Sequence, residues 1–321
     1  MKCELTVECA DIARFSCDVL VLKFAQSFYG ADWQVANLLK PQTLGEIAPA
    51  ADEFVLLPAN RRLAAEKVLF VGVVRLQRFD YEQIRKFAAH SLEILADAAP
   101  EAKHIAMTVH GVGAGLDERE SFLAQVAGLL DALNADAGPR SLERITIVEI
   151  NPRRATRLRQ ILDNDLKLSA KATESRSLST RSPESLAISS AGAGSNAKPH
   201  VFVAMPFSKE MEDVYRFGIQ NPVNAAGFLC ERVDMAIFTG DIVARIKSRI
   251  ETAALVIADL TGANANVYLE VGYAWGKNRP TLLLAKNLDD LKFDVKGERC
   301  IIYENISDLE RKLQADLAAL K

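Results

Sequence analysis

The spacing of hydrophobic residues predicts an α/β protein in which strands and helices alternate along the chain. Short apolar runs, typical of buried strands, are expected at 5–9, 18–24, 53–57, 67–74, 104–109 and 145–150 in the first half, and at 201–204, 228–231, 254–258, 280–285 and 300–303 in the second. Apolar residues three or four positions apart predict helices at 81–96, 117–133, 152–162, 210–226, 241–252, 266–275 and 307–320. This order indicates mostly parallel sheets with helices on both faces.

A segment of different composition separates the two halves. Residues 166–198 are rich in serine and include the run Ala191-Gly192-Ala193-Gly194-Ser195, so few of their side chains could repay the entropy of ordering. We therefore expect two three-layer α/β domains, at residues 1–165 and 199–321, joined by a flexible linker at 166–198. A chain of 321 residues is long enough for two such domains.

The composition excludes several classes of protein. Hydrophobic residues make up 49% and charged residues 25%, so each half can bury a core. A net charge of −3, with no basic stripe interleaved with aromatic residues, disfavours nucleic-acid binding. No apolar run approaches the roughly 20 residues that span a bilayer, and the five cysteines form no CxxC pair. We expect a cytoplasmic protein with reduced thiols, no membrane contact, no metal and no resident cofactor.

The most informative segment is Ala258–Ala274. An apolar run ends at Asp259, a glycine-containing turn follows, and a helix is expected to begin near Asn266. Glu270 is four positions after Asn266 and shares its helix face, while Gly272 leaves room for a close approach. Asp259 and Glu270 are therefore expected near the carboxyl end of a strand, where open α/β sheets bind ligands.

Polar clusters that follow two neighbouring strands should meet the same edge. The candidate substrate-binding residues are Met205, Pro206, Phe207, Arg232, Asp234, Thr261, Asn266 and Tyr273. Arg232 could hold a phosphate or carboxylate with two hydrogen bonds, and amides at the start of the helix could hold a phosphate. Purely structural roles stay open, since Asp259 could cap the turn and Arg232 could pair with Asp234 at the surface.

A fixed carboxylate at this edge suits cleavage of an N-glycosidic bond. Breaking that bond builds positive charge on the anomeric carbon, which a carboxylate can stabilise or attack. Glu270 is the candidate for this role and Asp259 is the second catalytic candidate. Nicotinamide in NAD is bound as a cationic pyridinium and leaves as a neutral molecule, so its departure requires no general acid. A purine or pyrimidine base, by contrast, must be protonated in order to leave. The residues alone leave both substrate classes open.

The segments Val201–Phe207, Arg232-x-Asp234 and Ala258–Ala274 resemble the nucleoside 2-deoxyribosyltransferase-like and TIR-like superfamily, over about Pro199 to Lys321. The resemblance implies a flavodoxin- or Rossmann-like parallel sheet with Glu270 as the catalytic carboxylate and Asp259 as the strand-end acid. TIR-like members of this superfamily cleave NAD at the nicotinamide bond. The resemblance therefore makes NAD a candidate substrate, and it allows an active site shared between subunits.

The first half contains a glycine-rich loop between an expected strand and an expected helix. Its candidate ligand-binding residues are His110, Gly111, Gly113, Gly115 and Asp117. Such a loop can expose amides to a phosphate, although a tight turn before a capped helix is the ordinary explanation. Together with residues 18–22 and 67–73 and the helix expected from Tyr81, this loop resembles the macro-like N-terminal domain of leucyl aminopeptidases. The form of the loop resembles that of a variant of this domain found ahead of effector domains in bacterial defence proteins. The resemblance implies a mixed sheet and nucleotide sensing or assembly, without peptidase activity.

These features together predict a triggered effector of antiviral defence that hydrolyses NAD. Its expected partners are a nucleotide substrate, a nucleotide signal at the N-terminal domain, and further copies of the same chain. One alternative is a nucleoside or nucleotide 2-deoxyribosyltransferase or N-glycosidase, which would release a free base. The other is a non-catalytic nucleotide-binding module that assembles, which would bind nucleotide without releasing any product.

Overall fold

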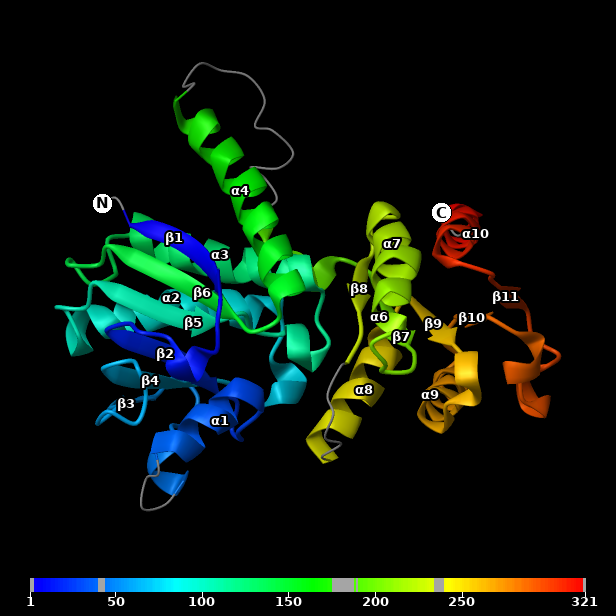
Figure 1. Ribbon diagram of the computed structural model, residues 1–321, viewed down its shortest axis with the longest axis horizontal. Helices are drawn as coiled ribbons and strands as arrows, with labels where there is room; N and C mark the ends of the chain where they lie inside the picture. Colours follow the sequence, from blue (N-terminus) through cyan, green and yellow to red (C-terminus); the bar gives the residue numbers. More distant parts are fainter. Residues whose placement is uncertain (1–2, 40–43, 175–187, 189, 234–239, 320–321) are drawn as a thin grey trace. The chain divides into compact units, whose positions relative to one another are not determined.

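The structure is a computed structural model that describes residues 3–39, 44–174, 188, 190–233 and 240–319. It forms two compact units, each built around its own sheet (Figure 1). The first unit comprises Met1–Val112 with Glu118–Asn196, and the second comprises Gly113–Asp117 with Ala197–Lys321. The prediction of two α/β domains, one with a mixed sheet and one with a parallel sheet, is confirmed.

The first unit contains a six-stranded sheet in the order β1-β6-β5-β2-β4-β3. Its strands are β1 (Glu4–Cys9), β2 (Val19–Phe24), β3 (Phe54–Pro58), β4 (Lys67–Gly72), β5 (His104–Thr108) and β6 (Arg144–Glu149). Only β3 and β4 pair antiparallel. Because β3 and β4 lie on one side of β2 and β5 and β6 on the other, the strand order reverses between β2 and β5.

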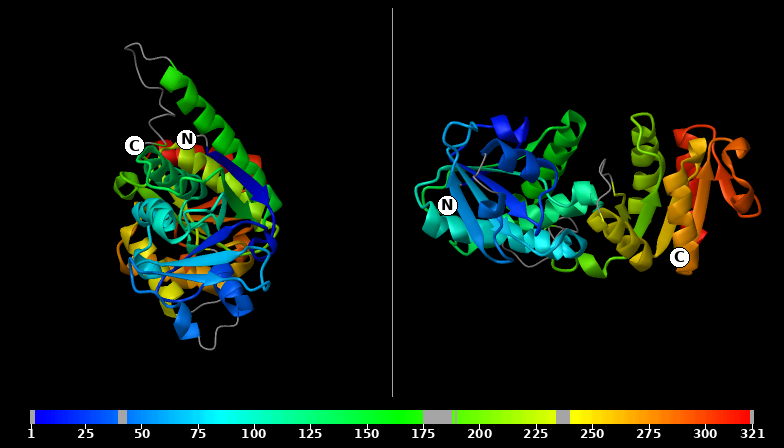
Figure 2. Two further views of the ribbon diagram at one scale, coloured as in Figure 1. Left: turned by 90° about the vertical axis from the view of Figure 1, so that its left-hand side faces the viewer. Right: turned by 90° about the horizontal axis from the view of Figure 1, so that it is seen from below.

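Four helices accompany this sheet: α1 (Gly30–Leu39), α2 (Tyr81–Ala98), α3 (Glu118–Asn134) and α4 (Pro152–Glu174). Figure 2 shows α1 on one side of the sheet and the α2–α3 pair on the other. A Cβ atom at Gly128 of α3 would lie 2.1 Å from the Arg85 carbonyl oxygen of α2, so glycine is required for this close approach. Arg159 of α4 donates its Nε to the carbonyl oxygen of Val7 at 2.8 Å, on the free edge of β1.

The region predicted to be a flexible linker differs from that expectation in two places. Helix α4 continues to Glu174, well into the expected linker. Further on, Ile188 and Ala191 are buried against Leu123 and Ala127 of α3, and Arg85 donates to the Ala191 carbonyl oxygen at 2.7 Å. Small side chains, which we interpreted as a sign of flexibility, here permit close packing on α3. The first unit therefore extends to Asn196 rather than ending at residue 165.

The second unit contains a five-stranded parallel sheet in the order β11-β10-β9-β7-β8. Its strands are β7 (His200–Ala204), β8 (Leu229–Glu231), β9 (Leu255–Asp259), β10 (Thr281–Ala285) and β11 (Cys300–Ile302). The chain runs outward from β7 to β8 and then continues at β9 on the other side of β7. The strand order therefore reverses between β7 and β9, and such a switch point is where open α/β sheets bind ligands.

Helices cover both faces of the second sheet. A continuous helical segment made of α6 (Met211–Asp213), the π-helix η6 (Val214–Gln220) and α7 (Asn221–Ala225) packs with α10 (Ile306–Ala319) over one face. Helices α8 (Gly240–Thr252) and α9 (Ala265–Gly276) cover the other. The alternation of apolar side chains along β7 and β9 separates the two cores, since Val203 and Ile257 face α10 while Ala204 and Ala258 face α9.

Candidate functional site

Glu270 lies on helix α9, which follows the carboxyl end of β9 that the sequence singled out. Asn264 caps the helix by accepting a hydrogen bond from the Asn266 amide at 2.9 Å. Val267, Val271 and Ala274 form the buried face of α9. Glu270 is next to that face, and its side chain is half-buried.

Burial changes the chemistry of Glu270. Burial alone raises the pKa of the carboxyl from the ordinary 4.5 to about 7. Among the described residues, no hydrogen bond or ion pair to this carboxylate is present. A desolvated carboxylate without a cationic partner is suited to meet a positive charge brought by a ligand.

Asp259 ends β9 and is fully buried. One of its oxygens accepts from the Thr261 amide at 3.0 Å, and the other accepts from the Tyr303 hydroxyl at 2.8 Å. Burial raises the pKa of Asp259, and the bonds from Thr261 and Tyr303 oppose that rise. Thr261 in turn accepts at its Oγ1 from the Lys286 amide at 3.1 Å. This network fixes the loop that leads from β9 into α9.

Arg232 follows β8 and is held among buried side chains. Its guanidinium lies 3.9 Å from the Tyr215 ring centre and 5.6 Å from that of Phe207. One nitrogen lies 3.6 Å from the Met205 Sδ and another donates to Glu212 at 2.8 Å. Met205 and Arg232 thus join the carboxyl ends of β7 and β8, as the sequence led us to expect.

The other predicted substrate-binding residues have varied positions. Pro206 is half-buried, and Phe207 and Asn266 are exposed. Tyr273 donates its hydroxyl to Glu251 of α8 at 2.5 Å, so its polar end is already engaged. Asp234 lies outside the described residues.

Sequence reasoning missed Tyr303, Tyr215 and Glu212. Tyr303 follows a short apolar strand, where a tyrosine is common and carries no signal that it bonds an acid 44 positions earlier. Tyr215 and Glu212 lie within an expected amphipathic helix, where an aromatic and an acidic residue are both ordinary. Only the tertiary contacts with Arg232 distinguish them.

The glycine loop of the first half is divided between the two units. His110 is buried, stacks edge-on against Phe87 at 4.6 Å, and accepts no hydrogen bond at its Nε2 atom among the described residues. Burial, and secondarily Lys23, hold its pKa well below the usual value. Gly111 adopts a positive φ of 88°. Gly113, Gly115 and Asp117 group with the second unit, where Asp117 accepts from the Cys230 amide at 3.2 Å.

The switch point of the first sheet also carries a buried ion pair that the sequence analysis missed. The Lys23 ammonium forms an ion pair with the Asp32 carboxylate of α1, and both residues are less than a tenth exposed. Burial raises the pKa of Asp32, and Lys23 opposes that rise. A lysine inside the apolar run of β2 was the available signal.

Comparisons with known proteins give a likeness of fold for half of the chain. No protein-family model matches the sequence, and no curated protein is similar to it. The N-terminal half resembles macrodomains. One is a macrodomain of Oceanobacillus iheyensis with ADP, at 13% identity and a TM-score of 0.42, covering 50% of this chain and 90% of that chain. Another is a Trypanosoma brucei macrodomain in complex with ADP-ribose, at 13% identity and a TM-score of 0.42, covering 49% of this chain and 68% of that chain.

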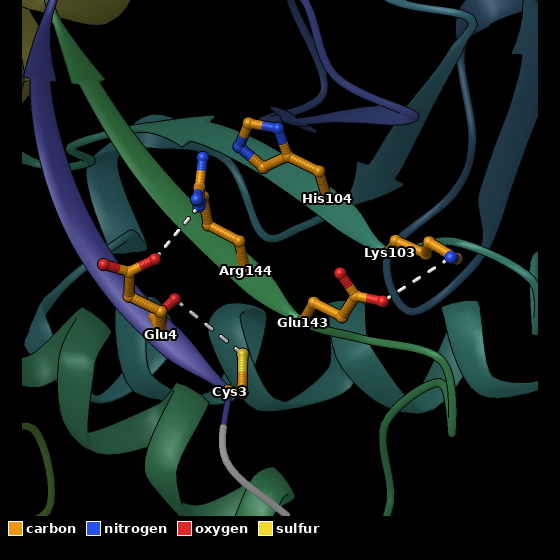
Figure 3. Close-up of a pocket in the computed structure, with 6 residues that line it drawn as sticks. All are labelled: Cys3, Glu4, Lys103, His104, Glu143 and Arg144. Atoms are coloured by element: carbon orange, nitrogen blue, oxygen red, sulfur yellow. Dashed lines mark hydrogen bonds and ion pairs between the residues drawn. The ribbon is translucent and has the colours of Figure 1, made fainter.

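A separate pocket of about 720 Å³ opens at the amino ends of β1, β5 and β6 (Figure 3). Glu4 pairs with Arg144 at 3.1 Å and Lys103 with Glu143 at 3.5 Å. These are exposed ion pairs of the kind that contribute little to stability. The pocket contains none of the residues that the sequence analysis proposed.

Three further observations concern the described part of the chain. None of its helices combines the length and apolar character needed to cross a membrane. Nowhere in it do three or more His, Cys, Asp or Glu side chains gather as metal ligands would. All five cysteines are free thiols.

Proposed function

We propose that this protein hydrolyses the N-glycosidic bond between nicotinamide and ribose in NAD, with Glu270 as the carboxylate at the reacting carbon. The observation that carries the proposal is a half-buried carboxylate, on the helix that follows the switch-point strand β9, that has no cationic partner among the residues that the structure describes. The string around it, 266–274, resembles the superfamily whose members use this glutamate.

The chemistry of the leaving group supports NAD. The nicotinamide–ribose unit carries a positive charge on the pyridinium, and this charge moves to the ribose as the bond breaks. An anionic Glu270 attracts the cation and stabilises the transition state, or forms a covalent intermediate that water then opens. Nicotinamide leaves as a neutral molecule, so no proton donor is required. Asp259, with both oxygens engaged, would act by holding the loop in place.

One observation favours the alternative of a nucleoside or nucleotide N-glycosidase or deoxyribosyltransferase. With a pKa of about 7, part of the Glu270 population is protonated at neutral pH. A protonated Glu270 could donate to a neutral leaving base. The two alternatives predict opposite pH profiles: cleavage of NAD should increase as pH rises through 7, and cleavage of a neutral nucleoside should decrease.

We further propose that the first unit controls this activity, by binding a nucleotide signal or by assembling copies of the chain, as part of antiviral defence. Uncontrolled hydrolysis would deplete a cofactor of the host cell, so the enzyme should be silent until triggered. The test is a comparison of rates with and without a panel of nucleotides, together with the oligomeric state under each condition.

The decisive experiment replaces the carboxylate of Glu270. The full chain and its Glu270→Gln variant are incubated with NAD, deoxynucleotides and nucleosides, and nicotinamide and free bases are separated by liquid chromatography. Loss of an electrostatic stabiliser predicts a decrease of about 10²- to 10³-fold or more in kcat. Glu298→Gln, an exposed position of the same unit, is the matched control and should keep full activity. Undiminished cleavage by Glu270→Gln would overturn the assignment.

A further inference from the structure

One edge of the first sheet has an unusual composition. β3 is the last strand on its side of the sheet (Figure 1), and its five residues, Phe-Val-Leu-Leu-Pro, carry no charge. Each of them is half-buried or exposed, and the exposed fraction of Phe54 is 45%. In most proteins a charged residue or a covering segment protects such an edge. β3 is therefore suited to accept a further strand.

The hydrogen bonds to β4 determine which backbone groups of β3 point outward. The Gly72 amide of β4 donates to the Glu53 carbonyl oxygen at 2.8 Å, just before β3 begins. Because hydrogen-bonded positions alternate along an antiparallel pair, the odd-numbered residues of β3 direct their backbone groups toward β4. Phe54, Leu56 and Pro58 therefore direct theirs away from it. Among the described residues, no acceptor meets the Phe54 or Leu56 amide.

The opposite edge of the same sheet is closed to such pairing. β1 has exposed acidic residues at Glu4 and Glu8, and Arg159 of α4 donates to the Val7 carbonyl oxygen. Association through β1 is therefore disfavoured. If two copies pair through β3, each uses its open edge, and the assembly ends at a dimer.

The two ends of β3 carry opposite charges. Asp52 and Glu53 precede the strand, whereas Arg61 follows it after Asn60, and all four residues are exposed. Two antiparallel copies would bring the acidic end of each strand beside the basic end of the other, and two parallel copies would bring like charges together. The strand is thus complementary to itself in the antiparallel arrangement. This favours a second copy of the chain as the occupant of the edge.

We propose that this protein forms a two-fold symmetric dimer in which the β3 strands of two copies pair antiparallel and join their six-stranded sheets. With the two Leu56 residues opposite each other, they exchange both backbone hydrogen bonds, and each Phe54 amide donates to the carbonyl oxygen of Pro58 of the partner subunit. Phe54, Leu56 and Pro58 share one face of the strand, so this register also places a proline against each exposed Phe54 ring. The inference identifies the surface for the assembly proposed above, and it rests on that part of the proposed function.

The first test measures the mass of the full chain in solution. Sedimentation velocity should show a monomer that converts to a dimer with a Kd on the order of 10 µM, because a single strand pair buries little surface. Phe54→Lys places a charge on the open edge and should weaken the dimer by about tenfold or more. Ile150→Lys introduces the same charge directly after β6, at a residue that is 68% exposed, and should leave the dimer unchanged.

A pair of charge reversals tests the antiparallel arrangement. Arg61→Glu and Asp52→Lys should each weaken self-association by about 2- to 10-fold, because each variant on its own brings like charges together at both ends of the interface. An equal mixture of the two variants should recover the affinity of the wild type, because opposite charges meet at both ends of the mixed dimer. Damage to the fold would not be repaired by mixing, so recovery identifies the pairing itself.

Hydrogen exchange gives a readout on single backbone groups. The Leu56 amide points outward in one copy and is bonded in the dimer, so its exchange should slow by about tenfold or more as the protein concentration rises through the Kd. The Leu57 amide, which faces β4, should be protected at every concentration. In Phe54→Lys the concentration dependence at Leu56 should disappear at concentrations where the wild type is dimeric.

The outcomes separate this inference from the proposed function. A chain that is monomeric at every concentration, or a dimer that Phe54→Lys and Ile150→Lys weaken equally, would overturn the β3 interface. Protection of Leu56 in a monomer would overturn it as well, since a segment of the same chain would then cover β3. A dimer through β3 that cleaves no N-glycosidic bond would support the interface and refute the enzyme, and cleavage of NAD by a strictly monomeric protein would do the reverse.

Discussion

Glu270→Gln should make the protein more stable at neutral and alkaline pH. The wild-type carboxyl has a pKa of about 7 in the folded protein, because it is half-buried and has no cationic partner in the described part of the chain, and an ordinary pKa of 4.5 in the unfolded chain. Between these two values the folded protein holds a proton that the unfolded chain has lost. The free energy of unfolding of the wild type therefore falls as pH rises from 4.5 to 7.

The size of this effect follows from the pKa shift. A shift of about 2.5 units at 1.36 kcal/mol per unit corresponds to about 3 kcal/mol. Glutamine resembles the protonated carboxyl in shape and charge, so the variant avoids this cost. The difference between variant and wild type should approach about 3 kcal/mol above pH 7.5 and vanish below pH 4.5.

Urea denaturation of both proteins at pH 4.5, 6 and 8, followed by circular dichroism, measures the difference. Taking variant minus wild type at each pH cancels the titration of every other group. The Glu298→Gln control, at an exposed position, should show no pH-dependent difference. A Glu270→Gln variant that is no more stable than the wild type at pH 8 would refute the idea that burial destabilises the ionised form of this carboxylate.

Two further predictions concern buried polar contacts. Asp32→Asn leaves Lys23 buried without its ion-pair partner and should lower the free energy of unfolding by about 3–5 kcal/mol; Glu101→Gln, which breaks the exposed pair with Lys67, should change it very little, and equal effects would contradict the distinction. Tyr303→Phe removes the hydroxyl that donates to Asp259 and should cost about 1–3 kcal/mol in urea denaturation, whereas unchanged stability would show that the hydrogen bond is replaced.

The elements that depend on local pattern could be predicted from the sequence. Apolar runs gave every strand of both sheets, and the helix expected at 266–275 is α9, whose start is set by the Asn264 cap. Helix α1 was missed, because it is short and begins at a glycine. The π-helix within the expected helix at 210–226 was also missed, since no residue pattern marks the wider turn.

Contacts between distant parts of the sequence could not be predicted. The bond from Tyr303 to Asp259 and the stacking of Arg232 on Tyr215 depend on which strands are neighbours and on which face each side chain lies. The packing of Ala191 on α3 depends on a gap that only the folded unit creates. The motif correctly gave the helix that carries Glu270 after β9, and the catalytic role of Glu270 stays a prediction.

The hydrogen bond from Arg159 to the Val7 carbonyl oxygen has a consequence for solubility. A sheet whose outermost strand offers unpaired backbone groups is a template for strands of other molecules, and this is a common start of aggregation. On β1 a charged side chain already occupies one of those acceptors. A variant in which α4 is truncated before Arg159 would therefore expose the Val7 carbonyl oxygen and should aggregate more readily through the edge of the sheet.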